Sequence, residues 1–193
     1  ETGLSADPPM IWRVSKFDKL NLISSSDPHS HHCHRIGREA TLFDIKNLSY
    51  KNLINAVRSK EGLIGTIEVD PNYGKYHFDG HRSCGISFSP QESKQHNNMC
   101  PRCKQKLTIG VQNRIEQLAD RPEGFVKKDS KKFHSLIPLG EIISLILKKG
   151  INTKTVTQEY SKILSKFSNE LDILMNVSFD NLKKETHEKI AEA

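Results

Sequence analysis

The chain has 193 residues, a formal net charge of +6 and 35% hydrophobic residues, and isoleucine and leucine recur at regular spacing throughout. This length and pattern indicate a folded chain with one medium or two small domains, and they exclude a wholly disordered protein. No apolar run approaches the roughly 18 residues that a membrane-spanning helix needs, and no secretory leader opens the chain, so we expect a cytoplasmic protein without a membrane partner. The chain begins at Glu1 rather than Met and ends inside a helical pattern. We therefore expect it to be a piece of a longer protein.

The excess of lysine and arginine favours anionic partners, nucleic acid above all. The basic runs can equally be solvated helix ends and loops, so charge alone is a weak indication. Four cysteines in a chain without a leader indicate a reducing compartment. There, paired cysteines bind metal more often than they form disulfides.

The first quarter of the chain has the pattern of the end of an α/β domain. Residues 1–13 contain glycine and adjacent prolines and are predicted to form a loop, and Leu20–Ser26 is predicted to form a short buried strand. A polar loop rich in histidine follows as far as Gly37. Ser49 is expected to cap a helix through about Lys60, which Gly62 ends.

The middle of the chain contains short extended segments and turns. Residues 64–69 and 75–78 flank an Asp-Pro-Asn-Tyr-Gly turn and are predicted to form a hairpin. Ser89 begins a short helix with a capping box, because proline follows it and Glu92 stands three residues later. Residues 100–109 are predicted to form a knuckle and a strand.

From Gly110 onward the apolar spacing becomes helical. Residues 111–118 and 138–149 each predict a helix, and apolar residues from Val156 to Leu174 predict one long amphipathic helix. Their apolar faces indicate core or partner surface. We expect no organic cofactor.

A structural zinc site is the strongest indication in the sequence. The pattern is His81-x2-Cys84, then fifteen residues, then Cys100-Pro-Arg-Cys103. A gap of two residues lets one tight turn present two ligands to an ion, and two such turns complete a tetrahedron. Four protein ligands leave no open position, so the site is structural. Cysteines buried as small hydrophobes are the alternative, and the fourth ligand is His81, with His77 and His96 also within reach in principle.

A second cluster follows the predicted strand. Asp27 and His29 stand one residue apart there, and His31, His32, Cys33 and His34 come directly afterwards. A carboxylate and an imidazole at the carboxyl end of a barrel strand can share a catalytic metal site. Two ligands do not complete a site, so a surface loop rich in histidine is the competing interpretation.

Several motifs together resemble the endonuclease Q family. They are Glu1-Thr-Gly-Leu-Ser-Ala-Asp-Pro-Pro-Met10, Ser24-Ser-Ser-Asp-Pro-His-Ser30, Gly37-Arg-Glu-Ala40, Gly74-Lys-Tyr-His-Phe-Asp-Gly-His-Arg-Ser-Cys84, Cys100-Pro-Arg-Cys103, Leu107-Thr-Ile-Gly-Val111 and Glu116-Gln-Leu-Ala-Asp-Arg121. The resemblance covers roughly residues 1–125, and the helical remainder is similar only in character.

The resemblance implies a mixed α+β architecture in three parts. Residues 1–61 would be the C-terminal segment of a PHP-type (polymerase and histidinol phosphatase) α/β barrel, residues 62–110 a small ribbon-like zinc-binding domain, and residues 111–193 a helical domain. The family cuts DNA beside deaminated bases with metal-activated water. Asp27 and His29 would be ligands of catalytic zinc, manganese or magnesium, and the family's earlier ligands are absent from this chain. His31, His32, Cys33 and His34 depart from the family pattern, in which fewer histidines are expected here, so more than one imidazole is available as a metal ligand.

Two functions of different classes follow. The first is a fragment of an endonuclease that nicks DNA 5′ to uracil, hypoxanthine or an abasic site, and this fragment alone is expected to be inactive. The second is a non-catalytic zinc module that binds nucleic acid or a helicase-type partner. A PHP-type phosphoesterase for small phosphate esters is disfavoured by the zinc domain and the basic charge.

Overall fold

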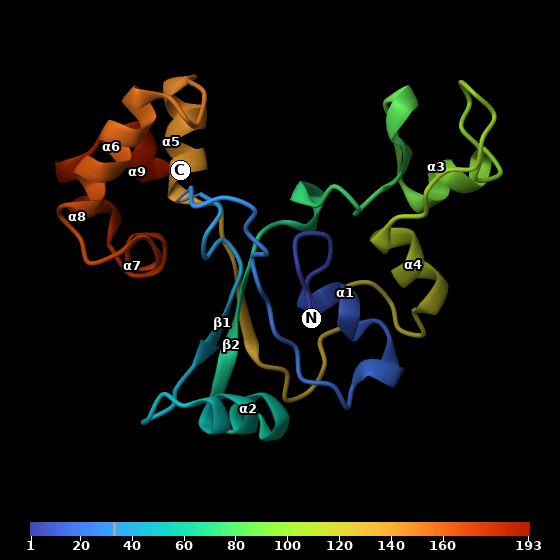
Figure 1. Cartoon of the computed structure of the whole chain (residues 1–193), viewed down its shortest axis with the longest axis horizontal. Helices are drawn as coiled ribbons and strands as arrows, with labels where there is room; N and C mark the ends of the chain where they lie inside the picture. Colours follow the sequence, from blue (N-terminus) through green and yellow to red (C-terminus); the bar gives the residue numbers. More distant parts are fainter. Residues whose placement is uncertain (33) are drawn as a thin grey trace. The chain divides into compact units, whose positions relative to one another are not determined.

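The computed structural model describes residues 1–32 and 34–193, which form two compact units. The first unit contains residues 1–27 and 39–135, and the second contains residues 28–38 and 136–193. Figure 1 shows small sheets and several helices, as expected for the mixed α+β class. The division into residues 1–61, 62–110 and 111–193 stays a prediction.

A three-stranded sheet organises the first unit. β2 (Leu63–Glu68) lies between β1 (Ala40–Phe43), which is antiparallel to it, and β5 (Lys132–Ser135), which is parallel to it. Gly65 is required where β5 approaches, because a Cβ atom there would lie 2.2 Å from the carbonyl oxygen of Lys132.

The helix predicted between β1 and β2 is confirmed. Ser49 caps α2 (Tyr50–Ser59) by accepting a hydrogen bond from the Asn52 N–H at 3.2 Å. Its end differs from the prediction, because the left-handed residue that closes the helix is Lys60, at φ 67°, and not Gly62.

Residues 21–26 have no regular secondary structure, so the strand predicted for Leu20–Ser26 is absent. The Thr41 hydroxyl bonds to both the N–H and the carbonyl oxygen of Ser24, each at 2.8 Å. The Ile23 carbonyl accepts from the Thr2 N–H at 2.9 Å. Several side-chain hydrogen bonds and this backbone bond therefore hold the segment in place of a strand ladder.

The hairpin predicted for residues 64–78 is wrong. Both edges of β2 are already paired, with β1 and β5, so no edge is left for residues 75–78. Asp70 caps a 3-10 turn (Pro71–Tyr73), and the next strand, β3 (Asp79–His81), pairs instead with β4 (Ile86–Phe88).

The opening of the chain is helical where a loop was predicted. Asp7 accepts from the Met10 N–H at 2.9 Å and Pro8 occupies the first turn, so α1 (Pro8–Trp12) has a complete start signal. A 3-10 turn (Ser15–Phe17) follows. Trp12 is buried, and its ring meets Phe133 of β5 edge to face with centroids 5.8 Å apart.

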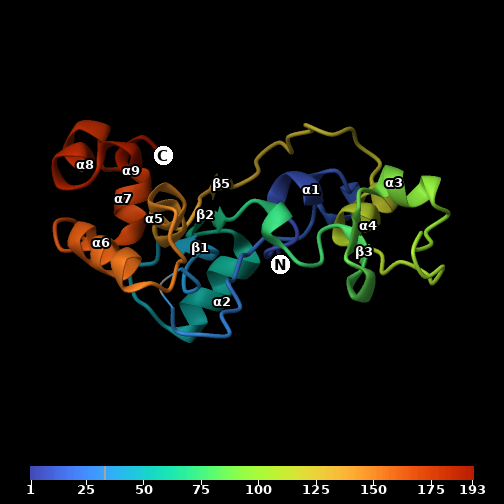
Figure 2. The same ribbon diagram turned by 90° about the horizontal axis from the view of Figure 1, so that it is seen from above.

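Short elements after β3 complete the first unit. The predicted capping box at Ser89 is present at the start of α3 (Pro90–Gln95), and α4 (Val111–Leu118) is present as predicted. Figure 2 shows β3 beside α3 and α4. Residues 100–109 form turns with isolated bridges, Gly80 to Thr108 and Met99 to Lys106, in place of the predicted strand.

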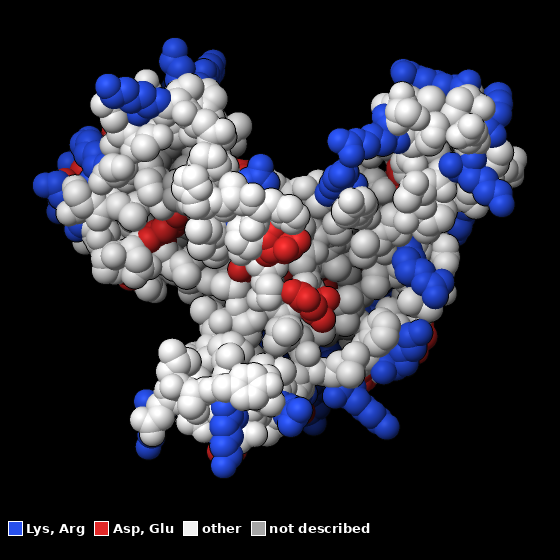
Figure 3. Space-filling model, in the orientation of Figure 1, with Lys and Arg blue, Asp and Glu red and all other residues white. Residues whose placement is uncertain are grey.

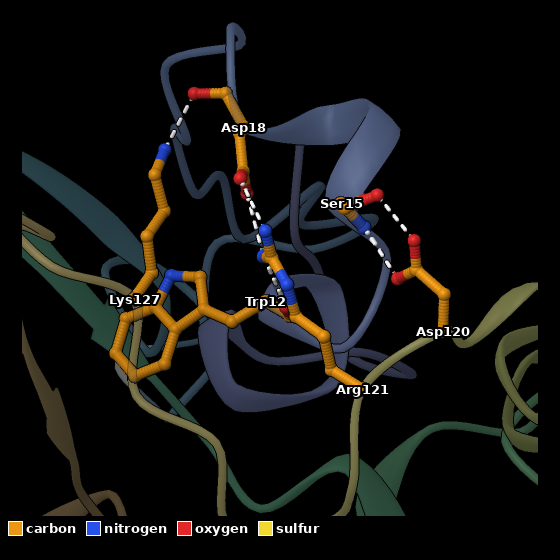
Figure 4. A network of polar contacts seen from close by, with 6 residues as sticks. All are labelled: Trp12, Ser15, Asp18, Asp120, Arg121 and Lys127. Carbon is orange, nitrogen blue, oxygen red and sulfur yellow. Dashed lines mark hydrogen bonds and ion pairs between the residues drawn. The ribbon is translucent and has the colours of Figure 1, made fainter.

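A polar network joins two segments of the first unit that are about 100 residues apart in the sequence, residues 12–18 and residues 120–127 (Figure 4). The Arg121 guanidinium donates to both carboxylate oxygens of Asp18 and to the Trp12 carbonyl oxygen. Asp120 accepts from the backbone N–H and the hydroxyl of Ser15, and Lys127 donates to the Asp18 carbonyl oxygen. Residues 12–18 are thereby fixed against residues 120–127.

The second unit is helical around one apolar core. Its helices are α5 (Leu139–Leu147), α6 (Lys154–Leu164), α7 (Glu170–Met175), α8 (Phe179–Glu185) and α9 (Glu188–Glu192). The single helix predicted from Val156 to Leu174 is broken, because the Asn169 side chain accepts from the Asp172 N–H and starts a new helix. Ile143 and Ile163 are fully buried in the core. Among the described residues, no helix has the length and apolar character to cross a membrane.

We expect Arg121→Ala to lower the melting temperature, because it leaves the Asp18 carboxylate and the Trp12 carbonyl oxygen without this donor. The hydrogen bond from Arg121 holds the pKa of Asp18 below its usual value. The stabilisation is therefore present above the unfolded-state pKa and is lost as the pH falls. Thermal unfolding should show a gap between wild type and variant at pH 7 that narrows below about pH 4. Arg58→Ala, at an exposed arginine on α2, is the control; an equal loss of stability there would contradict the prediction.

Candidate functional site

Four side chains converge at one end of the first unit. One ligand atom from each of His81, Cys84, Cys100 and Cys103 lies within 4.8 Å of the others. It is the one group of this kind found within residues 1–32 and 34–193. Three thiols and one imidazole are a ligand set that can hold a metal ion such as zinc.

Two tight turns present these ligands. β3 ends at His81, and a 3-10 turn carries Cys84 and closes at Gly85, whose φ of 62° suits glycine. The second turn forms where the Cys100 carbonyl oxygen accepts from the Lys104 N–H at 2.9 Å. Arg102 joins the turns by donating to the Cys84 carbonyl oxygen at 2.7 Å.

The geometry separates the three candidate histidines. Nδ1 of His81 lies 3.3 Å from Cys103 Sγ, and its Nε2 lies 3.3 Å from the Ser83 hydroxyl. A ligand histidine is normally oriented in this way, by a partner on its second nitrogen. His77 is instead buried with Nδ1 3.0 Å from the Ser5 carbonyl oxygen. The His96 ring stacks on Phe88 at 4.9 Å.

The electrostatics of the thiols suit a bound cation. Burial opposes ionisation of Cys100, but hydrogen bonds from the backbone of Cys103 and Arg102 and from the side chains of Cys103 and His81 together outweigh it and lower the pKa of Cys100 to about 6. The pKa of Cys84 is raised to about 11, first by its hydrogen bond with Cys103 and then by burial and by Cys100. Neighbouring thiolates repel one another, so a metal cation would allow all three to ionise together.

The predicted catalytic residues Asp27 and His29, unlike the Cys3His group, are not brought together with other metal ligands among the described residues. Asp27 is the last residue of the first unit, is exposed and has a left-handed φ of 40°, and His29 is an exposed residue of the second unit. Neither belongs to a metal-binding group among the described residues. Their catalytic role stays a prediction.

A buried acid anchors the segment that leads to Asp27. Glu68 of β2 is fully buried and accepts from the Ser24 hydroxyl at 3.0 Å and from the Thr2 hydroxyl at 2.8 Å. Burial raises the pKa of Glu68 to about 7, against the lowering effect of the Thr66, Thr2 and Ser24 hydroxyls and with help from the negative charge of Glu39. Glu39, also buried, accepts from the Leu4 N–H at 2.8 Å.

Sequence reasoning missed both acids. The available signal was the position of Glu68 inside an apolar run, Leu63-Ile-Gly-Thr-Ile-Glu-Val69, where a charged residue requires polar partners.

The additional histidines form a stack and do not converge on one point. The His31 and His32 rings lie 5.1 Å apart with 27° between their planes, and the His32 and His34 rings lie 5.3 Å apart with 12° between them. His34 is buried, and burial, followed by the nearby positive charges of Arg35, His32 and Arg38, lowers its pKa. Cys33 lies outside the described residues.

Comparison with known proteins places these features in context. Residues 138–193 match the family described as the MJ0043 C-terminal domain. The whole chain is 34% identical to the uncharacterised protein MJ0043 of Methanocaldococcus jannaschii over an alignment of 199 residues, and it spans 25% of that protein.

Two solved structures are similar over nearly the whole chain. The lesion-specific endonuclease PfuEndoQ of Pyrococcus furiosus matches 98% of this chain with 30% identity and a TM-score of 0.83. An endonuclease Q in complex with a 27-mer duplex that has an abasic lesion at the active site matches 98% with 30% identity and a TM-score of 0.88. The resemblance to endonuclease Q inferred from the sequence is confirmed. This chain spans 47% and 48% of those two proteins.

If the Cys3His group binds zinc, the purified reduced chain should contain about one tightly held zinc, and its removal should unfold this end of the first unit. Cys100→Ser and His81→Ala should each lower the metal content. His96→Ala should leave it unchanged, because that ring lies outside the group. Elemental analysis and circular dichroism would measure the result. A folded, reduced chain without metal would contradict the prediction.

The buried Glu68 should make stability depend on pH. Its folded-state pKa, raised from 4.5 to about 7, means that the folded chain retains a proton that the unfolded chain loses, so stability should fall as the pH rises from about 4.5 through 7. Relative to Glu68→Gln, wild type should lose up to about 3 kcal/mol of unfolding free energy over this range. Denaturant titrations at several pH values would give the slope of unfolding free energy against pH for wild type and for Glu68→Gln. Parallel slopes would show that Glu68 does not titrate in this range.

Proposed function

We propose that this chain is part of a metal-dependent DNA endonuclease that nicks DNA 5′ to a deaminated base or an abasic site. The observation that carries the proposal is the similarity to two endonuclease Q structures over 98% of the chain, one of which holds a duplex with an abasic lesion. Both matches have 30% sequence identity, so the likeness extends beyond the backbone.

The parts of the proposed enzyme follow the expected division. Residues 1–61 would contribute the end of the PHP-type barrel, residues 62–110 the zinc-binding domain and residues 111–193 the helical domain. The Cys3His group supports the second assignment. The three-stranded sheet takes β1 from the first part, β2 from the second and β5 from the third, so these parts would be joined through one sheet. We place the enzyme in the cytoplasm, where reduced thiols are available to a metal.

Asp27 and His29 would hold catalytic divalent metals, zinc, manganese or magnesium, with further ligands from other parts of the longer protein. Such metals activate water for attack on the phosphodiester and stabilise the leaving oxygen. The other residues of this chain would hold Asp27 in position. Glu68, Thr41 and Thr2 fix the segment around Ser24, three residues before Asp27.

Selection of the lesion has a physical basis in base extrusion. A deaminated base pairs poorly and therefore costs less to flip from the stack, and an abasic site has no base to unstack. The net charge of +6 supplies phosphate affinity that does not depend on sequence.

A non-catalytic zinc module that binds nucleic acid is the second candidate. One observation favours it: within the described residues, no third ligand joins Asp27 or His29 in a metal-binding group. This chain alone should therefore have no nuclease activity under either proposal, and the full-length protein distinguishes them.

In the full-length protein, Asp27→Asn should abolish nicking and leave DNA binding largely intact, because the carboxylate would bind metal and not DNA. Asp129→Asn is a matched control, since Asp129 is also an exposed aspartate with a left-handed φ, 59° against 40° for Asp27. Nicking of duplexes with and without one uracil, hypoxanthine or abasic site would be measured with manganese, magnesium or zinc. Cutting by the Asp27 variant near the wild-type rate would remove this residue from the active site, and failure to cut any lesion would favour the non-catalytic module.

A further inference from the structure

A groove of about 530 Å³ lies in the first unit beside the Cys3His group, and no catalytic or zinc-binding role uses it. We call it the Tyr76 groove; it is lined by residues that include Lys75, Tyr76, Arg82, Ile86 and Ile109. Its walls come from the segment after the Pro71–Tyr73 turn, from β3 and β4, and from the residues that precede α4. Chain segments more than 20 residues apart in sequence therefore meet around it.

Hydrogen bonds fix the walls of the groove to one another. The Tyr76 carbonyl oxygen accepts from the Val111 N–H at 2.8 Å, and the backbones of Gly80 and Thr108 exchange two bonds at 2.8 and 2.9 Å. The buried Asp79 carboxylate accepts from the Gly110 N–H at 2.6 Å and from the Asn113 amide. A groove held in this way exists before a ligand binds, which reduces the entropy lost on binding.

The surface of the groove combines an aromatic face with positive charge. Tyr76 is 63% exposed, and Lys75 Nζ lies 5.1 Å from the centroid of its ring. Ile109 is 42% exposed on the same groove. Exposed apolar groups that gather in a concave site mark a binding surface more often than isolated ones do.

The charge around the groove selects an anionic ligand. Residues 75–110 contain six lysines and arginines and only two acids, Asp79 and Glu92. The carboxylate of Asp79 is buried and hydrogen-bonded inside the wall, whereas Lys75 and Arg82 are exposed. Figure 3 shows lysine and arginine side chains gathered over the end of this unit that carries α3. A ligand with a flat aromatic face and a phosphate satisfies both the ring and the cations.

The groove and the metal group share their supporting elements. β3 contributes Gly80 to the groove and His81 to the metal group, and the 3-10 turn that follows contributes Arg82 to the groove and Cys84 to the metal group. A metal at the group would therefore also fix the cationic side of the groove.

We propose that the Tyr76 groove binds a nucleotide of a DNA strand, with the base stacked on Tyr76 and the backbone phosphate paired with Lys75 and Arg82. The choice of DNA rests on the proposed function, and the stacking and charge come from the groove itself. Any base can stack on an aromatic ring, so the groove would bind a DNA strand without sequence specificity. It would hold DNA outside the metal-dependent centre and so position the strand for cleavage there.

The test measures binding of this 193-residue chain, with its metal, to a fluorescent single-stranded oligonucleotide that contains 2-aminopurine. Tyr76→Ala should weaken binding roughly five- to a hundredfold and abolish the quenching of 2-aminopurine, whereas Tyr76→Phe, which keeps the ring, should stay within about twofold of wild type. Tyr50→Ala is the matched control, because Tyr50 is 80% exposed on α2 and lines no part of the groove. Metal content and circular dichroism of each variant would show that the fold is retained.

A second set of variants tests the phosphate contacts independently of the ring. Lys75→Gln and Arg82→Gln should each lower the slope of log affinity against log salt by roughly 0.7 for a single strand. Equal affinity of wild type and Tyr76→Ala, an equal loss in Tyr76→Phe, unchanged salt slopes, or no measurable DNA binding would each overturn the groove assignment. Binding that depends on Tyr76, together with a full-length protein that nicks no lesion, would overturn the proposed function and leave the groove assignment standing.

Discussion

Convergence of His81, Cys84, Cys100 and Cys103 is the constraint on which one end of the first unit depends. Residues 79–110 have two strands of three residues and few buried apolar side chains, chiefly Cys100 and Leu107. A two-stranded pair of this length is marginal in water. Linking the two turns through one ion would supply the stability that this small apolar core does not.

In the rest of the first unit, side-chain hydrogen bonds hold segments of irregular backbone in place. The residues before Asp27 form no ladder, so hydroxyl groups of Thr2, Ser24 and Thr41 and the carboxyl group of Glu68 satisfy their polar atoms. Arg121 and Asp120 do the same for residues 12–18. Networks of this kind fix one arrangement when every member is bonded, and they leave a catalytic or binding residue at a defined position.

Local signals predicted more of the structure than distant pairings did, although the caps at Asp7 and Asn169 were missed. The caps at Ser49 and Ser89, the helix 111–118 and the three grouped cysteines were all readable, because each depends on a few neighbouring residues. The hairpin at residues 64–78 failed, because the partner of β2 in the parallel direction begins only at Lys132. The burial of Glu39 and Glu68 likewise follows from contacts with Leu4 and Thr2, across 35 and 66 positions. A single sequence can show that a charged residue inside an apolar run needs polar partners, but it does not identify partners so far away along the chain.

The second unit is discontinuous in sequence, since residues 28–38 belong to it together with residues 136–193. The match to the MJ0043 C-terminal domain covers only the later of these two pieces. The Cβ of His34 lies 3.6 Å from the position that a Cβ on Gly140 would take, so the earlier piece packs against the start of α5. A fragment that begins at Leu136 would therefore lack residues 28–38, which pack against its first helix. Transfer of residues 136–193 alone to another protein would separate the buried His34 from α5, which it contacts. The helices of the second unit are therefore expected to be inherited together with residues 28–38, which include His29.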